Sequence, residues 1–125
     1  MSDSPDETLA LARAAAEAVR ALNHATLGGG LGQPSDAYAV LGELSLTASR
    51  IPQLLGQVGR WLAAALAAGR LGCDDGTDPA AAVSGAWLFI SDARAGAASL
   101  ARDLEQAQQQ LAAVNGQPSQ KEERS

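Results

Sequence analysis

The chain contains one histidine, His24, and one cysteine, Cys73, and these two side chains have the most obvious capacity for chemistry. A thiol beside an imidazole is the minimum of a nucleophilic hydrolase, because the imidazole can take the thiol proton. The same two residues cannot supply the four ligands of a structural zinc site. Whether they could act together depends on the distance that the fold puts between them.

The densest glycine cluster, LGGGLG at residues 27–32, follows His24 directly. Backbone N–H groups of a glycine loop in front of a helix can bind a phosphate. Here no Lys-Ser or Lys-Thr follows the glycines, no strand pattern precedes them, and the nearest charges are Asp36 and Glu43. Because glycine runs end helices, we interpret the segment as a helix stop and a turn.

A second loop gathers the carboxylates Asp74, Asp75 and Asp78. A calcium-binding EF-hand loop that began at Asp74 would need a glutamate where Gly85 stands, so the loop is interpreted as a solvated turn. Isolated carboxylates among alanines and arginines are typical of surface charges. They are Glu17, Glu43, Asp92 and Asp103. We therefore predict no catalytic residue, no metal site and no cofactor.

The formal charge is −5, and Lys121 is the only lysine, so the folded region has no lysine for a Schiff base or a Walker motif. The arginines are scattered and form no basic stripe, which argues against direct nucleic-acid binding. The first residues, MSDSPDETLA, lack the features of a signal peptide, and the apolar stretch 61–68 is far shorter than a membrane span. We expect a cytoplasmic protein without membrane contact.

Start and stop signals divide the chain into three helices, at about residues 5–27, 35–70 and 79–114. Ser4 followed by Pro5 and Glu7 is a complete start signal with a capping box. The third helix starts in a similar way at Asp78 and Pro79. The stop signals are the glycines from Gly28 onward, Gly69 with Gly72, and Gly116 after Asn115. Residues 1–116 are predicted to form a single helical domain, and residues 117–125 a charged, disordered tail.

Apolar residues in the second and third segments recur every three or four positions, the spacing of helices that pack lengthwise. The two series are Leu41, Leu44, Ala48, Ile51, Leu55, Val58, Leu62, Ala65, and Val83, Ala86, Ile90, Ala93, Ala97, Leu100, Leu104, Ala107, Leu111, Val114. Pro52 removes a backbone hydrogen bond within the first series, at a cost of about 3 kcal/mol in a straight helix. Because the spacing continues in register through Pro52, we predict a kink in one long helix. The alternative is a break, with Ser49 capping a new helix.

Short loops join antiparallel neighbours, so the predicted fold is all-α, an antiparallel up-down-up three-helix bundle. At 1.5 Å per residue the second and third helices are roughly 54 Å long, whereas the short first helix is roughly 34 Å long. The first helix then reaches only to about the level of Gln57. In this arrangement His24 and Cys73 lie at opposite ends, about 50 Å apart, which excludes a thiol–imidazole pair.

The end of the bundle beyond the first helix carries large apolar residues, named here the candidate patch: Trp61, Leu66, Trp87, Leu88 and Phe89. Counting back from the loop, Trp61 lies opposite residue 88 and Trp87 opposite residue 62. One interpretation makes the tryptophans the plug of an alanine-rich core. The other makes the patch an exposed association surface, for which a homodimer is the simplest closure.

The segments ALNHAT at 21–26, PSDAYAVLGELSLTASRIPQLLGQVGRWL at 34–62 and GRLGCDDGTDPAAAV at 69–83 resemble small all-helical hypothetical proteins of Streptomyces-type actinobacteria. That resemblance covers most of residues 20–114. It implies a plasmid or integrated conjugative element as context, and no catalytic residue. It directs attention to Leu41-Gly42, to Pro52-Gln53 and to the corner residues Asn23, His24 and Tyr38, which either pack the corner or present it to a partner.

We expect a non-enzymatic helical bundle that acts through protein–protein contacts, as an accessory or regulatory factor of an actinobacterial mobile element. The alternative is a small-molecule-binding bundle, with the ligand between the helices near Trp61 and Trp87. A closed cavity beside the tryptophans would favour that alternative. An enzyme is a third option, disfavoured by the missing lysine and by the separation of His24 from Cys73.

Overall fold

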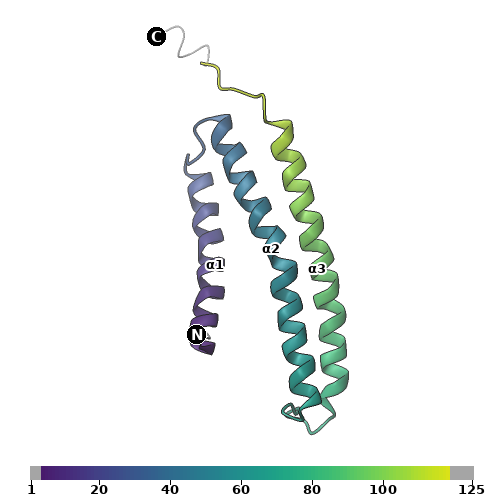
Figure 1. The fold of residues 1–125 in the computed structure, drawn as a ribbon. Helices are drawn as coiled ribbons and strands as arrows, with labels where there is room; N and C mark the ends of the chain where they lie inside the picture. Colours follow the sequence, from purple (N-terminus) through teal and green to yellow (C-terminus); the bar gives the residue numbers. More distant parts are fainter. Residues whose placement is uncertain (1–3, 119–125) are drawn as a thin grey trace. The chain divides into compact units, whose positions relative to one another are not determined.

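The computed structural model describes residues 4–118, which contain three α-helices and no strand. The helices are α1, Pro5–Leu27, α2, Pro34–Ala67, and α3, Pro79–Gln110 (Figure 1). The all-α class is therefore confirmed. The helices α2 and α3 end before the predicted residues 70 and 114. Most of the predicted tail, 117–125, lies outside the described residues.

The chain divides into two compact units, which are described separately. One unit contains α1, the first turn of α2 up to Ala37, and the segment that follows Val114. The other unit, called the hairpin below, is Tyr38–Val114 and holds the rest of α2, the connecting loop and α3. The up-down-up bundle stays a prediction.

Local hydrogen bonds explain where α1 begins and ends. The Ser4 side chain accepts from the N–H of Glu7, and the Glu7 carboxylate accepts from the N–H of Ser4, which is the predicted capping box. At the other end Gly29 has a φ of 92°, a conformation that glycine adopts without strain. The N–H of Gly30 then donates to the carbonyl of Ala25 at 2.8 Å, closing the last turn. The glycine cluster is thus a helix stop.

The helix α2 continues through Pro52 without a break at Ser49, while the kink stays a prediction. It ends in a Schellman motif around Gly69, which has a φ of 70°. The N–H of Gly69 donates to Leu66, and the N–H of Arg70 donates to Ala65, each at 3.0 Å. These two bonds satisfy the last carbonyls and stop the helix at Ala67, earlier than predicted.

The helix α3 begins as predicted. The Asp78 carboxylate accepts from the N–H of Ala80, and Pro79 is the first residue of the helix. Its C-terminal end tightens: the N–H of Leu111 and of Ala112 each donate to the carbonyl three residues earlier. Such three-residue bonds replace the α-helical pattern at helix ends, so the regular helix stops at Gln110.

Within the hairpin, α2 and α3 lie side by side and are joined by three side-chain hydrogen bonds (Figure 1). Ser45 Oγ donates to the carbonyl of Ala101 at 2.9 Å, Arg94 Nε to that of Pro52 at 3.0 Å, and Gln108 Nε2 to that of Tyr38 at 3.2 Å. From one bonded pair to the next, the residue number in α2 rises by as much as the residue number in α3 falls. The two helices therefore run in opposite directions in one register.

That register differs by three residues from the predicted one, because the prediction counted from a helix end at residue 70. In the sequence, the two residues of each bonded pair lie equally far from the observed helix ends, Ala67 of α2 and Pro79 of α3. Trp87 accordingly packs on Gly59 rather than opposite residue 62. The two tryptophans still lie within about a turn of each other along the hairpin.

The buried part of the hairpin consists of small residues only: Ala48, Gly56, Gly59, Ala65, Ala97 and Ala101. Four of the ten residues in the predicted α3 series do not face a partner helix, since Ala93, Leu100, Ala107 and Val114 are exposed. Arg94 and Gln108 take the corresponding places beside α2. An apolar pattern could not reveal them, because these side chains lie on α2 with their stems and donate to its carbonyls with their polar ends.

Three glycines of α2 receive the long side chains of α3. A Cβ at Gly42 would meet Gln108, one at Gly56 would meet Arg94 at 3.3 Å, and one at Gly59 would overlap the ring of Trp87. The missing Cβ atoms thus provide the space in which the α3 side chains lie, and a glycine in the middle of a helix has here a packing reason.

Candidate functional site

The residues with the clearest chemical potential are not brought into one site. His24 is exposed in the last turn of α1, whereas Cys73 is half-buried in the loop of the hairpin, which is the other unit. Their predicted separation therefore stays a prediction. Within residues 4–118 no three His, Cys, Asp or Glu side chains are grouped as metal ligands, and no helix there is long and apolar enough to cross a membrane.

The acidic loop forms a turn of its own. The Thr77 hydroxyl donates to Asp75 Oδ1 at 2.7 Å, and the Thr77 N–H donates to the same atom at 3.0 Å. These two bonds, the hydroxyl bond first, hold the pKa of Asp75 below its ordinary value. With Asp78 as N-cap of α3, two of the three loop carboxylates have local structural roles.

The corner residues have only local or backbone contacts. Asn23 and His24 are exposed on α1, where the carbonyl of Asn23 accepts from the Thr26 hydroxyl at 3.2 Å. Tyr38 contributes its carbonyl to the bond from Gln108, and its ring is exposed. That these residues pack the corner or present it to a partner stays a prediction.

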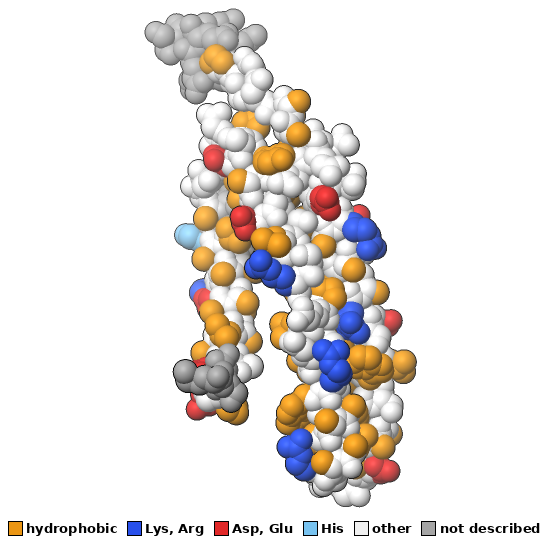
Figure 2. Space-filling model, in the orientation of Figure 1, with side chains coloured by type: hydrophobic (Ala, Val, Ile, Leu, Met, Phe, Trp, Pro, Cys, Tyr) orange, Lys and Arg blue, Asp and Glu red, His pale blue; other side chains and the backbone are white. Residues whose placement is uncertain are grey.

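The candidate patch lies in the hairpin, toward the loop that joins α2 and α3. Exposed fractions are 58% for Trp61, 39% for Trp87, 67% for Leu88 and 77% for Phe89, and Leu66 is half-buried. Hydrophobic side chains gather over this end of the two helices (Figure 2). Four large apolar side chains are thus offered to solvent in a hairpin whose buried residues are alanine and glycine.

An apolar groove of about 600 Å³ runs between α2 and α3 at this end, and we call it the hairpin groove. It is partly open to solvent. Its lining comes from both helices: Gly59, Arg60, Leu62, Ala63, Leu66, Ala67 from α2, and Val83, Ser84, Trp87, Leu88, Ile90 from α3. Three members of the candidate patch, Leu66, Trp87 and Leu88, therefore form part of one concave surface.

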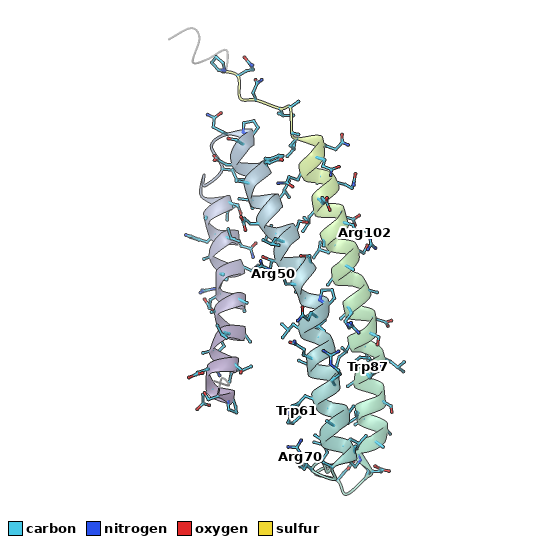
Figure 3. The ribbon with its side chains drawn as sticks, viewed as in Figure 1. Arg50, Trp61, Arg70, Trp87 and Arg102 are labelled. Atoms are coloured by element: carbon cyan, nitrogen blue, oxygen red, sulfur yellow. The ribbon has the colours of Figure 1, made fainter. Side chains whose placement is uncertain are left out.

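Trp61 and Phe89 do not line the hairpin groove. Trp61 stands beside Arg70, whose guanidinium carbon lies 5.7 Å from the centre of the indole ring (Figure 3). A cation over an indole face is attracted by the ring. This contact attaches the start of the loop to α2 and orients one face of Trp61 toward Arg70.

The charges around the groove were not singled out by the sequence. Between Glu43 and Asp74 the chain has three arginines, Arg50, Arg60 and Arg70, and no carboxylate. The only ion pair within residues 4–118 is Arg20 with Glu17, on α1, so none of the hairpin arginines is paired there. The missing carboxylates were the signal that could have revealed these cations.

Arg60 and Arg94 approach each other above Gly56. Atoms of both guanidinium groups lie within 3.5 Å of the point where a Cβ of residue 56 would stand. Gly56 therefore gives room to two like charges, one of which, Arg60, lines the hairpin groove. An unpaired guanidinium pair is suited to a carboxylate, which can accept several hydrogen bonds at once.

A second hollow, of about 510 Å³, lies between the same helices toward the other end. Its lining is more polar and includes Ser45, Ser49, Arg102, Glu105 and Gln108. Ser45 and Gln108 already bond to backbone carbonyls across the hairpin, so this hollow belongs to the contact between α2 and α3.

No protein-family model matches the chain, and comparisons with curated proteins and with solved structures found no match.

Proposed function

We propose that this protein works by binding protein through the loop-proximal end of the hairpin, without catalysis. One observation carries the proposal: Trp61, Trp87, Leu88 and Phe89 are exposed together at one end of two packed helices, beside an apolar groove. Large apolar side chains that gather on a surface typically mark association, and tryptophans are enriched among the residues that dominate binding energy.

Affinity capture from cells of the native source tests the proposal. Wild-type protein is compared with the double variant Leu88→Ser, Phe89→Ser, and with Leu11→Ser as matched control, because Leu11 is an equally exposed leucine on α1. We expect bound proteins to be lost with the double variant and kept with the control. If the double variant keeps them all, the patch is not the binding surface.

A small molecule in the hairpin groove is a second candidate, favoured by the 600 Å³ volume and the nearly apolar lining. Trp87 lies in this lining, so an apolar ligand in the groove would change its fluorescence. Under this alternative, titration of apolar compounds shifts the tryptophan emission with saturation. Absence of any saturable shift argues against it.

The up-down-up arrangement and the kink at Pro52 remain part of the proposal. The amphipathic α1 exposes Leu9, and α2 exposes Leu54. A double-mutant cycle with Leu9→Ala and Leu54→Ala should give a coupling energy above about 0.5 kcal/mol if these helices pack. Additive effects would show that Leu9 and Leu54 do not interact, against the packing of α1 on this part of α2.

A further inference from the structure

Two unpaired, opposite charges flank the apolar surface of the hairpin. Arg60 lines the groove from α2. Asp92 follows Leu88 by four residues on α3, and residues at this spacing are neighbours on one helix face. Within the described chain neither charge has an ion-pair partner. The surface therefore offers a cation on one helix, a carboxylate on the other, and exposed Leu88 and Phe89 in addition.

The position of Arg60 favours a carboxylate that comes from outside the chain. Its guanidinium stands next to that of Arg94 over Gly56, and a carboxylate placed beside the two cations would offset their repulsion. Arg94 already donates to the carbonyl of Pro52, which holds it in place. On α3 between Asp78 and Asp103 the only carboxylate is Asp92.

We infer that the occupant of the hairpin groove is a second copy of this chain, in a two-fold symmetric dimer. Leu88 and Phe89 of each copy cover the groove of the other, and Asp92 of each copy pairs with Arg60 of the other. This inference rests on the proposed function and names its partner. A two-fold contact requires a self-complementary surface, in which residue i meets j and j meets i. Arg60 and Asp92, which do not pair within one copy, meet this requirement, because Arg60 of each copy can pair with Asp92 of the other.

Other occupants satisfy only part of the pattern. An anionic membrane would face Asp92 and the loop carboxylates Asp74, Asp75 and Asp78, all of its own sign. An unrelated acidic helix would pair with Arg60 and leave Asp92 without a partner. A second copy pairs both charges with residues that the hairpin itself supplies, Asp92 for Arg60 and Arg60 for Asp92.

Charge reversal tests the inference on the full chain by sedimentation velocity over a series of concentrations. Asp92→Arg alone and Arg60→Glu alone should each weaken dimerisation by at least about tenfold, because each places like charges opposite each other at two symmetric contacts. An equimolar mixture of the two variants should dimerise again, since every contact is then of opposite sign. The matched controls, Asp103→Arg and Arg50→Glu, should dimerise as the wild type does.

Both positions are exposed, so far-UV circular dichroism should show unchanged helix content in all variants. A wild-type chain that stays monomeric at every concentration overturns the inference, and so does a mixture that dimerises no better than its components. Stronger binding to phosphatidylserine vesicles than to a second copy also overturns it. None of these results affects the capture experiment, which tests the proposed function with the apolar variants alone.

Discussion

Replacing Gly59 by alanine gives the most direct test of how the hairpin is packed. A Cβ at this position would overlap the ring of Trp87, closer than real Cβ atoms approach a neighbour. The ring is rigid and lies against the backbone of α2, so either it or the helix must shift. The same substitution at Gly85 of α3 adds a methyl group that meets nothing within 4 Å.

The two substitutions should change the free energy of unfolding in opposite directions. Alanine stabilises a helix interior by about 1 kcal/mol relative to glycine, and Gly85→Ala should show this gain in full. At residue 59 the same gain is opposed by overpacking, which costs about 1–3 kcal/mol and leaves a net loss of about 1 kcal/mol. The variants should therefore lie about 2 kcal/mol apart, or roughly 10 °C in melting temperature for a unit of this size.

Thermal unfolding followed by far-UV circular dichroism measures this difference. Tryptophan fluorescence should also change in Gly59→Ala, through Trp87, and stay unchanged in Gly85→Ala. Adding Trp87→Leu to Gly59→Ala should remove most of the penalty, because the smaller side chain leaves room for the methyl group. If Gly59→Ala raises the melting temperature as much as Gly85→Ala does, Trp87 does not pack on Gly59 and the argument is refuted.

Three further outcomes are expected. Asp78→Ala removes the N-cap of α3 and should lower the free energy of unfolding by about 1 kcal/mol in urea titrations. Arg94→Ala removes a charged donor from the carbonyl of Pro52 and should cost about 2 kcal/mol in the same assay, whereas no change would show that the bond is dispensable. Thr77 lowers the pKa of Asp75 in the folded protein below its ordinary value of 3.8. The ionised carboxylate therefore stabilises the fold above pH 3.8, and this stabilisation is lost as the pH falls through the lowered pKa. NMR titration should show the Asp75 pKa rising in Thr77→Val.

Helix boundaries were predictable where a short motif decides them. Ser4 with Glu7 and Asp78 with Pro79 need only their own neighbours to cap a helix, and both signals are correct. The end of α2 was placed three residues late, since the sequence offers both Gly69 and Gly72 as stops. Only the backbone shows that Gly69 adopts the positive φ and closes the Schellman motif.

The contact between the helices was less predictable, because it does not follow apolar spacing. The pattern identified Ala97 of α3 correctly as buried but chose Ala93 over Arg94. A prediction based on hydrophobicity excludes arginine from a helix contact, although Arg94 packs against Gly56 of α2 in the structure. A usable signal was present: Gly42 and Gly56 are as far apart in α2 as Arg94 and Gln108 are in α3.

The candidate patch was predicted from residue type and helix length, and four of its five residues are exposed in the hairpin, while Leu66 is half-buried. The groove that includes Leu66, Trp87 and Leu88 could not be derived, because it depends on which sides of the two helices face each other. Likewise, the stretch without carboxylates contains Arg50 and Arg70 as well, so the sequence could not single out Arg60 among the three. Its place beside Arg94 above Gly56 distinguishes Arg60 in the structure.

The glycine positions also limit how the two helices can slide along each other. An alanine-rich contact alone has little preference among alignments one heptad apart, since small side chains fit almost anywhere. A shift of seven residues would move Arg94 from Gly56 onto Ser49 or Ala63, and Gln108 away from Gly42, so each long side chain would meet a Cβ. The glycine positions thus favour the observed alignment over those shifted by one heptad in either direction.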